Sequence, residues 1–294
     1  MKNIYSLFTL LLVSFSINAQ SLIDGFSSQK GDLSVTLGYT FSNFDEFYLG
    51  TEKMDGVPAH NEITQHIISL YAKYGITDKV SIILNLPYFS ASGDGDTDPV
   101  NGETSIADFQ DISVAFKGVT PIYNFEKGSL DIVGGLGFSI PLGYEPNGIL
   151  SIGSGVFTVS YTGGLHLNTS SGFFATALAN YNLRGDAKSD IIASNFSVPN
   201  TFSATGKIGY ASSLIYVDAW VSLADSDEGV DIGGEGFTGN FPETNVEYNM
   251  FGATVYKDIL PELGVSLGYS TIFDGRNVGA SSNYSIGFTY NLKN

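Results

Sequence analysis

Few residues in this sequence have the chemistry that catalysis requires. Histidine occurs only at His60, His66 and His166, and there is no cysteine. A serine hydrolase needs a nucleophile, a base and a group that orients the base. Ser154 lies between two glycines, but its surroundings do not match the Gly-x-Ser-x-Gly elbow. We therefore predict no catalytic residues, no cofactor and no enzyme activity, and we interpret His166 as a polar lining residue rather than a base or metal ligand.

Aspartates at alternate positions, Asp94, Asp96 and Asp98, suggest a calcium loop. The EF-hand pattern then requires a glycine at position six and a glutamate at position twelve, where this chain has Pro99 and Ser105. We therefore favour a solvated acidic loop over a metal site. Further acids in the segment 225–244 predict a negative rim that concentrates cations and loses its effect at high salt. Bridging to lipopolysaccharide through divalent cations is a second use of such a rim.

Charged and aromatic residues also occur within segments of alternating polarity. Their phase predicts that they face the interior of a barrel and line a pore: Lys73, Asp111, Lys117, Asp131, His166, Lys207, Tyr216, Asp218, Trp220 and Glu247. They can form ion pairs that cross-link a narrow interior, or a constriction that orients a solute. We favour pairing because charges in a narrow barrel need partners. Tyr71, Tyr216 and Trp220 can stack on an aromatic or sugar ring, or anchor the chain at a membrane interface.

Period-two alternation predicts the elements that position these residues. In the segment 32–41 five apolar side chains alternate with polar ones, and the segment 281–292 repeats the pattern. Strands about 10 to 15 residues long suit a tilted crossing of a membrane better than a soluble sheet. Twelve are predicted, with ten or fourteen left open: 32–41, 62–76, 79–89, 108–119, 129–141, 153–167, 172–183, 200–210, 213–224, 245–258, 262–272 and 281–292.

The connections between these segments alternate in length. Those after even-numbered strands are short, including the stretch 121–128, and those after odd-numbered strands are longer and acidic. Short periplasmic turns opposite long outer loops are typical of bacterial outer-membrane barrels. The polar faces carry mainly Ser, Thr, Asn and Gly, which suits a narrow lumen better than the water-facing side of a soluble β-sandwich. The predicted fold class is all-β, a transmembrane antiparallel up-and-down β-barrel.

The N-terminus predicts export. Lys2 precedes an apolar run from Ile4 to Ile17, and Ala19 offers a cleavage site, so residues 1–19 are predicted to be a signal peptide and residues 20–294 the barrel. The run is shorter than the roughly 20 residues of a membrane-spanning helix. A net charge of −17 argues against nucleic acid as a partner. The export signal and the predicted barrel together indicate that the protein lies in the outer membrane of a Gram-negative bacterium.

Four stretches carry a family resemblance: GDLSVTLGYTF (31–41), YAKYGITDKVSIILNLPYFS (71–90), ADFQDISVAFKG (107–118) and GGLGFSIPLG (134–143). They are similar to the outer-membrane protein family associated with the meta-pathway of phenol degradation, a group of presumed transporters. The resemblance implies a porin-like barrel that takes aromatic or other small compounds. The C-terminus, with Gly287, Tyr290 and Leu292, resembles the signal read by the barrel assembly machinery, but Lys293-Asn294 replaces the usual terminal aromatic.

Two hypotheses of function follow from the sequence. The first is an outer-membrane channel for passive diffusion of small molecules, with aromatic or hydrophobic compounds suggested by the resemblance. The second is a closed structural or adhesive barrel whose acidic loops bind cations or partners. The predicted partners are outer-membrane lipid, lipopolysaccharide, a small-molecule solute and, during biogenesis, the assembly machinery.

Overall fold

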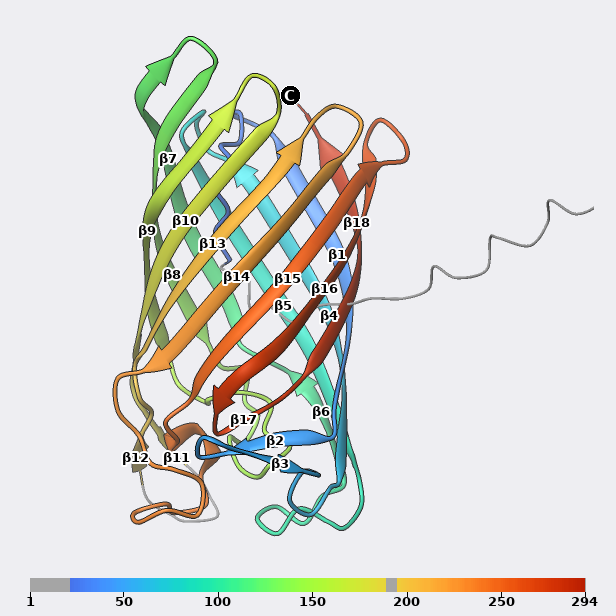
Figure 1. Cartoon of the computed structure of the whole chain (residues 1–294), viewed down its shortest axis with the longest axis vertical. Coiled ribbons are helices and arrows are strands. Elements are labelled where there is room, and N and C mark those ends of the chain that lie inside the picture. Colours follow the sequence, from blue (N-terminus) through green and yellow to red (C-terminus); the bar gives the residue numbers. More distant parts are fainter. Residues whose placement is uncertain (1–21, 189–194, 294) are drawn as a thin grey trace, which may run out of the picture.

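The computed structural model describes residues 22–188 and 195–293. In these residues twelve antiparallel strands form a closed barrel (Figure 1), as predicted. Each strand pairs with its neighbours along the chain, and β1 closes the barrel by pairing with both β18 and β4. The described part of the chain contains no helix long and apolar enough to cross a membrane. The predicted signal peptide lies outside the described residues.

The barrel strands are 11 to 15 residues long. They are β1 (Leu33–Phe44), β4 (Glu62–Gly75), β5 (Val80–Asp94), β7 (Ile112–Phe125), β8 (Gly128–Ile140), β9 (Thr158–Thr169), β10 (Phe173–Arg184), β13 (Thr201–Ala211), β14 (Tyr216–Ser226), β15 (Glu247–Asp258), β16 (Leu263–Arg276) and β18 (Ser282–Leu292).

The two faces of the barrel have opposite polarity because side chains alternate along each strand. Large apolar side chains such as Leu37, Ile68 and Leu267 are about half exposed on the outside, at 53%, 49% and 51%. Polar side chains such as Ser42 and Asn283 are fully buried inside. This inversion of the usual globular pattern follows directly from the period-two alternation, and it gives the outside an apolar surface.

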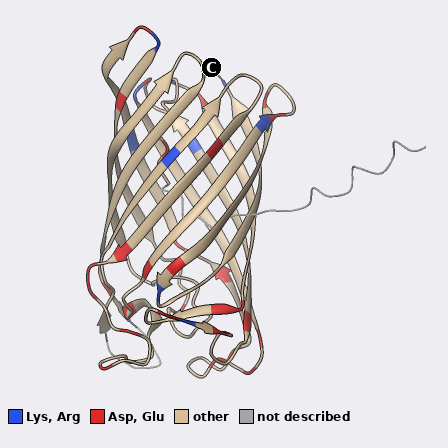
Figure 2. Ribbon diagram, viewed as in Figure 1, with Lys and Arg blue, Asp and Glu red and all other residues tan. Residues whose placement is uncertain are grey.

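The connections differ between the two ends of the barrel, as the spacing predicts. At one end short turns join neighbouring strands, and at the other end long segments fold into small sheets (Figure 1). These loop-end elements are β2 (Glu46–Leu49) paired with β3 (Glu52–Asp55) and β17 (Val278–Gly279), β6 (Ser105–Phe109) against β5, β11 (Asp186–Lys188) with β12 (Asn195–Ser197), and η1 (Phe241–Glu243). Many of the acidic residues lie at this loop end (Figure 2).

Three predicted details are wrong. The turn placed at 121–128 is shorter, because β7 continues through Pro121 to Phe125 with a register shift beside Pro121 that absorbs the missing N–H donor. Asp98 is buried rather than solvated, and it accepts hydrogen bonds from the backbone of Val100 and Ile149, so it joins two loops. This correction concerns the burial of Asp98 and not metal binding, since the described residues contain no group of three metal-ligating side chains.

The third correction concerns the phase of β15. Its even-numbered residues face the interior, where Met250 packs against Trp220. Glu247 therefore lies on the opposite face, at the loop end, where Arg276 Nη1 donates to its carboxylate at 3.2 Å. Phe251, Ala253 and Val255 alternate with the even-numbered residues on the outer face, where Phe251 and Val255 are 44% and 41% exposed. The apolar residues in the middle of β15 therefore follow the usual alternation, and the prediction that Glu247 faces the interior is wrong because Glu247 shares their outward phase.

Candidate functional site

The residues before β1 fold into the barrel. Residues 22–30, here the N-terminal segment, run inside the barrel towards the turn end (Figure 1, dark blue). Ile23 packs in a buried cluster with Ile83, Val119 and Val133, whose side chains face the interior. At the far end of the segment the N–H of Lys30 donates to the side chain of Asp78 at 2.9 Å, in the turn after β4. The interior is therefore partly filled by the chain itself.

An ion-pair cluster holds the middle of this segment. The carboxylate of Asp24 accepts hydrogen bonds from Lys73 Nζ at 3.0 Å and from Lys117 Nζ at 2.8 Å. Lys117 also donates to the carbonyl of Phe26 at 2.6 Å, and its side chain is 1% exposed. Two cations from β4 and β7 thus converge on one carboxylate, and Asp24 supplies the counter-charge that buried ammonium groups require.

An aromatic cluster holds the next part of the segment. The ring of Phe26 lies 4.6 Å from the ring of His166, 5.0 Å from that of Phe174 and 6.1 Å from that of Tyr216, each in an edge-on arrangement. Such edge-to-face contacts are favourable because the ring quadrupoles attract. His166 Nδ1 bonds with Thr176 at 2.8 Å, which orients the imidazole. Phe26 therefore occupies an aromatic pocket formed by β9, β10 and β14.

Two glycines permit the close passage of the segment. A Cβ at Gly25 would lie 2.3 Å from His166 Nδ1, and a Cβ at Gly75 would lie 1.9 Å from the carbonyl oxygen of Gln29. Real Cβ atoms do not approach other atoms so closely, so any side chain at Gly25 forces the segment or the imidazole to move.

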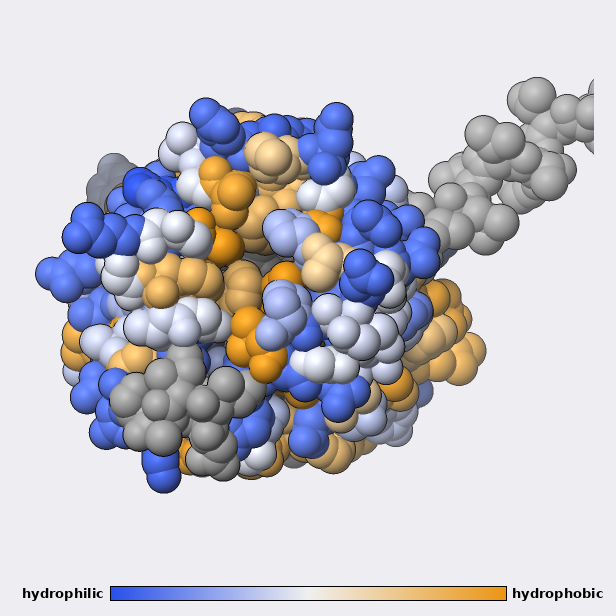
Figure 3. Space-filling model, turned by 90° about the horizontal axis from the view of Figure 1, so that it is seen from below, coloured by the Kyte–Doolittle hydropathy of each residue, from blue (hydrophilic) through white to orange (hydrophobic). Residues whose placement is uncertain are grey.

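Cavities follow one another along the barrel from the loop end to the turn end. A loop-end vestibule of about 310 Å³ is lined by apolar side chains including Phe47, Ile63 and Phe241. Seen from that end, apolar side chains gather near the middle of a largely hydrophilic surface (Figure 3). The vestibule shares Ser154 and Arg184 with a chamber of about 310 Å³. The loop end thus leads into the interior through an apolar entrance.

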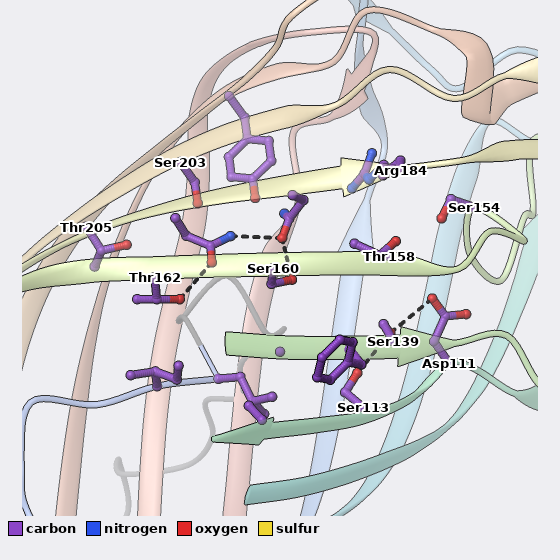
Figure 4. A pocket seen from close by; sticks show the side chains of 18 residues that line it. Asp111, Ser113, Ser139, Ser154, Thr158, Ser160, Thr162, Arg184, Ser203 and Thr205 are labelled. Atoms are coloured by element: carbon purple, nitrogen blue, oxygen red, sulfur yellow. Dashed lines mark hydrogen bonds between the residues drawn. The ribbon is translucent and has the colours of Figure 1, made fainter. Parts of the chain in front are cut away.

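The chamber is lined mainly by hydroxyl and amide side chains. Ser113, Ser139, Ser160 and Thr162 point towards it, with Arg184 at one side (Figure 4). Many of these groups bond with each other, as in the Thr162 hydroxyl donating to Asn180 at 2.8 Å. Small polar residues therefore leave a hydrated space where larger side chains would fill the barrel.

The N-terminal segment separates the chamber from the turn end. Between them lies a constriction of about 40 Å³ lined by Ile23 to Phe26 and by Thr205, Lys207 and Tyr216. Beyond it a turn-end vestibule of about 440 Å³ shares Asp24, Phe26, Lys207 and Tyr216 with the constriction. The cavities thus form a row along the barrel that narrows where the segment crosses it.

The structure brings several predicted residues together and disperses others. Lys73, Lys117, His166 and Tyr216 surround the N-terminal segment. Other predicted residues lie elsewhere. Lys207 Nζ pairs with Asp218 at 2.9 Å, Asp111 accepts from Tyr144 beside the chamber, Asp131 lies opposite His166 on β8, and Trp220 packs against Tyr48. Ion pairing, the favoured interpretation, occurs for Lys73, Lys117, Lys207 and Asp218, while the role of the predicted residues as pore lining stays a prediction.

Sequence reasoning missed Ile23, Asp24 and Phe26. The stretch between the predicted cleavage site and the first strand is short and has no periodicity. Three apolar residues and an acid among polar ones were the available signal. Nothing local connects Asp24 with Lys117, which is 93 residues away in sequence.

Comparisons with known proteins support the fold. No family model matches the chain, and no curated protein matches it. The barrel superimposes on the COG4313 outer membrane channel from Pseudomonas putida F1 with a TM-score of 0.76 and 11% identity, over 92% of this chain and 98% of that chain. Looser likenesses are the NanC porin (TM-score 0.49, 11% identity, 88% and 100% covered) and the CymD monoaromatic hydrocarbon channel (0.44, 12%, 97% and 95%). The chain therefore has the twelve-stranded fold of an outer-membrane channel.

Proposed function

We propose that this protein is an outer-membrane channel for passive diffusion of small molecules. The observation that carries the proposal is the row of cavities along the barrel, in which each cavity shares lining residues with the next. A barrel with a purely structural role has no need for such a path. At the constriction the path is narrowed by residues 23–26, which belong to no strand and are held by side-chain contacts.

The apolar outer face supports a location in a lipid bilayer. Side chains such as Leu136, Leu165 and Val221 are exposed on that face at 37%, 44% and 55%. A continuous surface of this kind is unfavourable in water and favourable in hydrocarbon. Because the long acidic connections gather at one end, we place that end outside the cell and the short turns in the periplasm. The fold likeness to an outer membrane channel supports the location in that membrane.

Small solutes with an apolar part fit the path best. The entrance is apolar, the chamber carries hydroxyl and amide groups, and the constriction combines an aromatic pocket with ammonium groups. Each region thus matches one part of an amphipathic molecule. The family resemblance of the sequence, which points to aromatic or other small compounds, agrees with these features.

The test is single-channel recording of the refolded chain in a planar bilayer. We expect discrete conductance steps with mostly closed intervals, because the N-terminal segment narrows the path. At low salt the acidic rim should favour cations at the mouth, and this preference should decline as salt is raised. A folded barrel that never conducts, even after the segment is displaced by Gly25→Leu, would contradict the proposal.

One observation favours the second candidate function, a closed structural or adhesive barrel. The gap beside the segment is only about 40 Å³, close to the space of a single water molecule. If the segment never leaves its position, the acidic loops become the functional surface. Absence of conductance in both the parent chain and the Gly25→Leu variant is the result expected from that alternative.

A further inference from the structure

The pocket that holds the N-terminal segment has the composition of a ligand-binding site. One half consists of the ammonium groups of Lys73 and Lys117, and the other half consists of the rings of His166, Phe174 and Tyr216. We call these two halves together the seat. The carboxylate of Asp24 fills the first half, and the ring of Phe26 fills the second.

The two groups that fill the seat form a compact unit. The N–H of Phe26 donates to the carboxylate of Asp24 at 2.7 Å, so the acid and the ring are held side by side. The carbonyl of Phe26 adds a further contact with Lys117 at 2.6 Å. A benzene ring with a carboxylate attached directly or through one carbon presents the same pair of groups.

The cationic half of the seat requires an anion. The side chains of Lys117 and Lys73 are 1% and 19% exposed, and Asp24 accepts from both. If the segment withdrew, two like charges would face one cavity without their carboxylate, which is strongly unfavourable in a site with little water. Withdrawal of Asp24 is therefore coupled to the arrival of another anion.

We propose that the seat binds a small aryl carboxylate in place of Asp24 and Phe26. The proposal rests on the channel function above and names its solute class: the N-terminal segment acts as an internal mimic of the solute, and the two compete for one seat. An arriving aryl carboxylate supplies both the counter-charge and the ring, so the segment leaves without uncovering either half.

The chamber on the loop-end side of the seat adds a third cation. Arg184 lines both the loop-end vestibule and the chamber, and its Nε is buried without a hydrogen-bond partner among the described residues. A buried guanidinium N–H that faces a cavity favours a carboxylate there. The chamber volume of about 310 Å³ lies in the range of small-molecule sites. An aryl carboxylate can thus pass from Arg184 to the lysines of the seat.

The test is calorimetric titration of the refolded full chain in detergent with sodium benzoate and sodium phenylacetate. Sodium acetate, which lacks the ring, and benzyl alcohol, which lacks the charge, serve as fragment controls. We expect benzoate or phenylacetate to bind at least tenfold more tightly than either fragment. Equal binding of acetate or benzyl alcohol overturns the proposal, because it leaves one half of the seat without a role.

Variants separate competition from simple binding. Asp24→Asn removes the competing carboxylate and should tighten benzoate binding by about tenfold or more, since a larger fraction of barrels has an empty seat. Asp96→Asn, in an exposed loop, is the matched control and should leave the affinity at the parent value. Lys117→Met should weaken binding at least tenfold, and Lys73→Met provides a second variant if the first fails to fold. Unchanged affinity in Asp24→Asn or in the folded lysine variants overturns the proposal.

Conductance of the same Asp24→Asn barrel distinguishes failure of the proposed channel function from failure of the proposed binding at the seat. Benzoate binding without any ion current would sink the channel function and leave the seat intact. Ion current that neither benzoate nor phenylacetate reduces, together with no calorimetric signal, would leave the channel function intact and refute the seat.

Discussion

Asp24→Asn should open the barrel, and the size of the effect can be worked from its contacts. The carboxylate accepts from two ammonium groups at 2.8 and 3.0 Å. Hydrogen bonds to charged groups contribute about 1.5–3 kcal/mol each. Because the Asp24 side chain is 34% exposed, we take the lower end for both contacts. The closed position should therefore lose about 3 kcal/mol, and with about 1.4 kcal/mol per factor of ten the ratio of closed to open barrels should fall about 100-fold.

Single-channel recording at fixed salt and voltage measures this ratio directly from open and closed times. Lys117→Met should act in the same direction, because it leaves Asp24 with one partner. The triple variant Asp24→Leu, Lys73→Met and Lys117→Met removes the carboxylate together with both of its ammonium partners. It should close more often than Asp24→Asn or Lys117→Met, since apolar side chains often replace a buried ion cluster without loss. Asp96→Asn is the control for charge alone. A closed-to-open ratio within threefold of the parent chain in Asp24→Asn would refute the idea that the segment gates the path.

Two further predictions concern the loops and the lipid-facing wall. Arg276 holds the pKa of Asp231 at about 2, below its usual 3.8, so this contact stabilises the loop end above pH 3.8 and is lost as the pH falls through 2. Hydrogen exchange in the loop around Asp231 should rise over that range, and Arg276→Met should move the rise towards pH 3.8. Leu267→Arg, in mid-strand on the outer face, should destabilise the barrel in liposomes by about 2–4 kcal/mol in urea titration. Leu142→Arg, in a loop, should not, and equal stability of the two variants would argue against a lipid-facing wall.

The barrel was predictable from sequence because its signals are local. In β18 the alternation of Tyr284, Ile286 and Phe288 with small polar residues is a property of neighbouring positions, and it determines which face is apolar. Turn spacing then sets which strands pair. The errors have different causes: Pro121 is accommodated by a register shift that depends on the paired strand, and Glu247 shares the phase of Phe251 and Val255, which form the outer face of β15.

The candidate site was predictable only in part. Phase alone identified Lys73, Lys117, His166 and Tyr216 as a group of polar and aromatic residues for the interior. Their shared partner was not predictable, because Asp24 and Phe26 belong to a short stretch without periodicity. Ion pairing was predicted in preference to a solute-orienting constriction, and ion pairs do occur. Lys73 and Lys117, however, pair with Asp24 of the N-terminal segment and not with a residue of another strand.

The amino-acid sequence by itself determined an antiparallel barrel, its apolar outside and the separation of short turns from long acidic loops, since each depends on spacing along the chain. It favoured twelve strands over ten or fourteen, and the closed structure decided that number. The tertiary structure alone decided that the N-terminal segment lies in the interior and fills a seat of two lysines and three rings. Those groups come from strands far apart in the sequence, and only closure of the barrel brings them around one carboxylate and one phenyl ring.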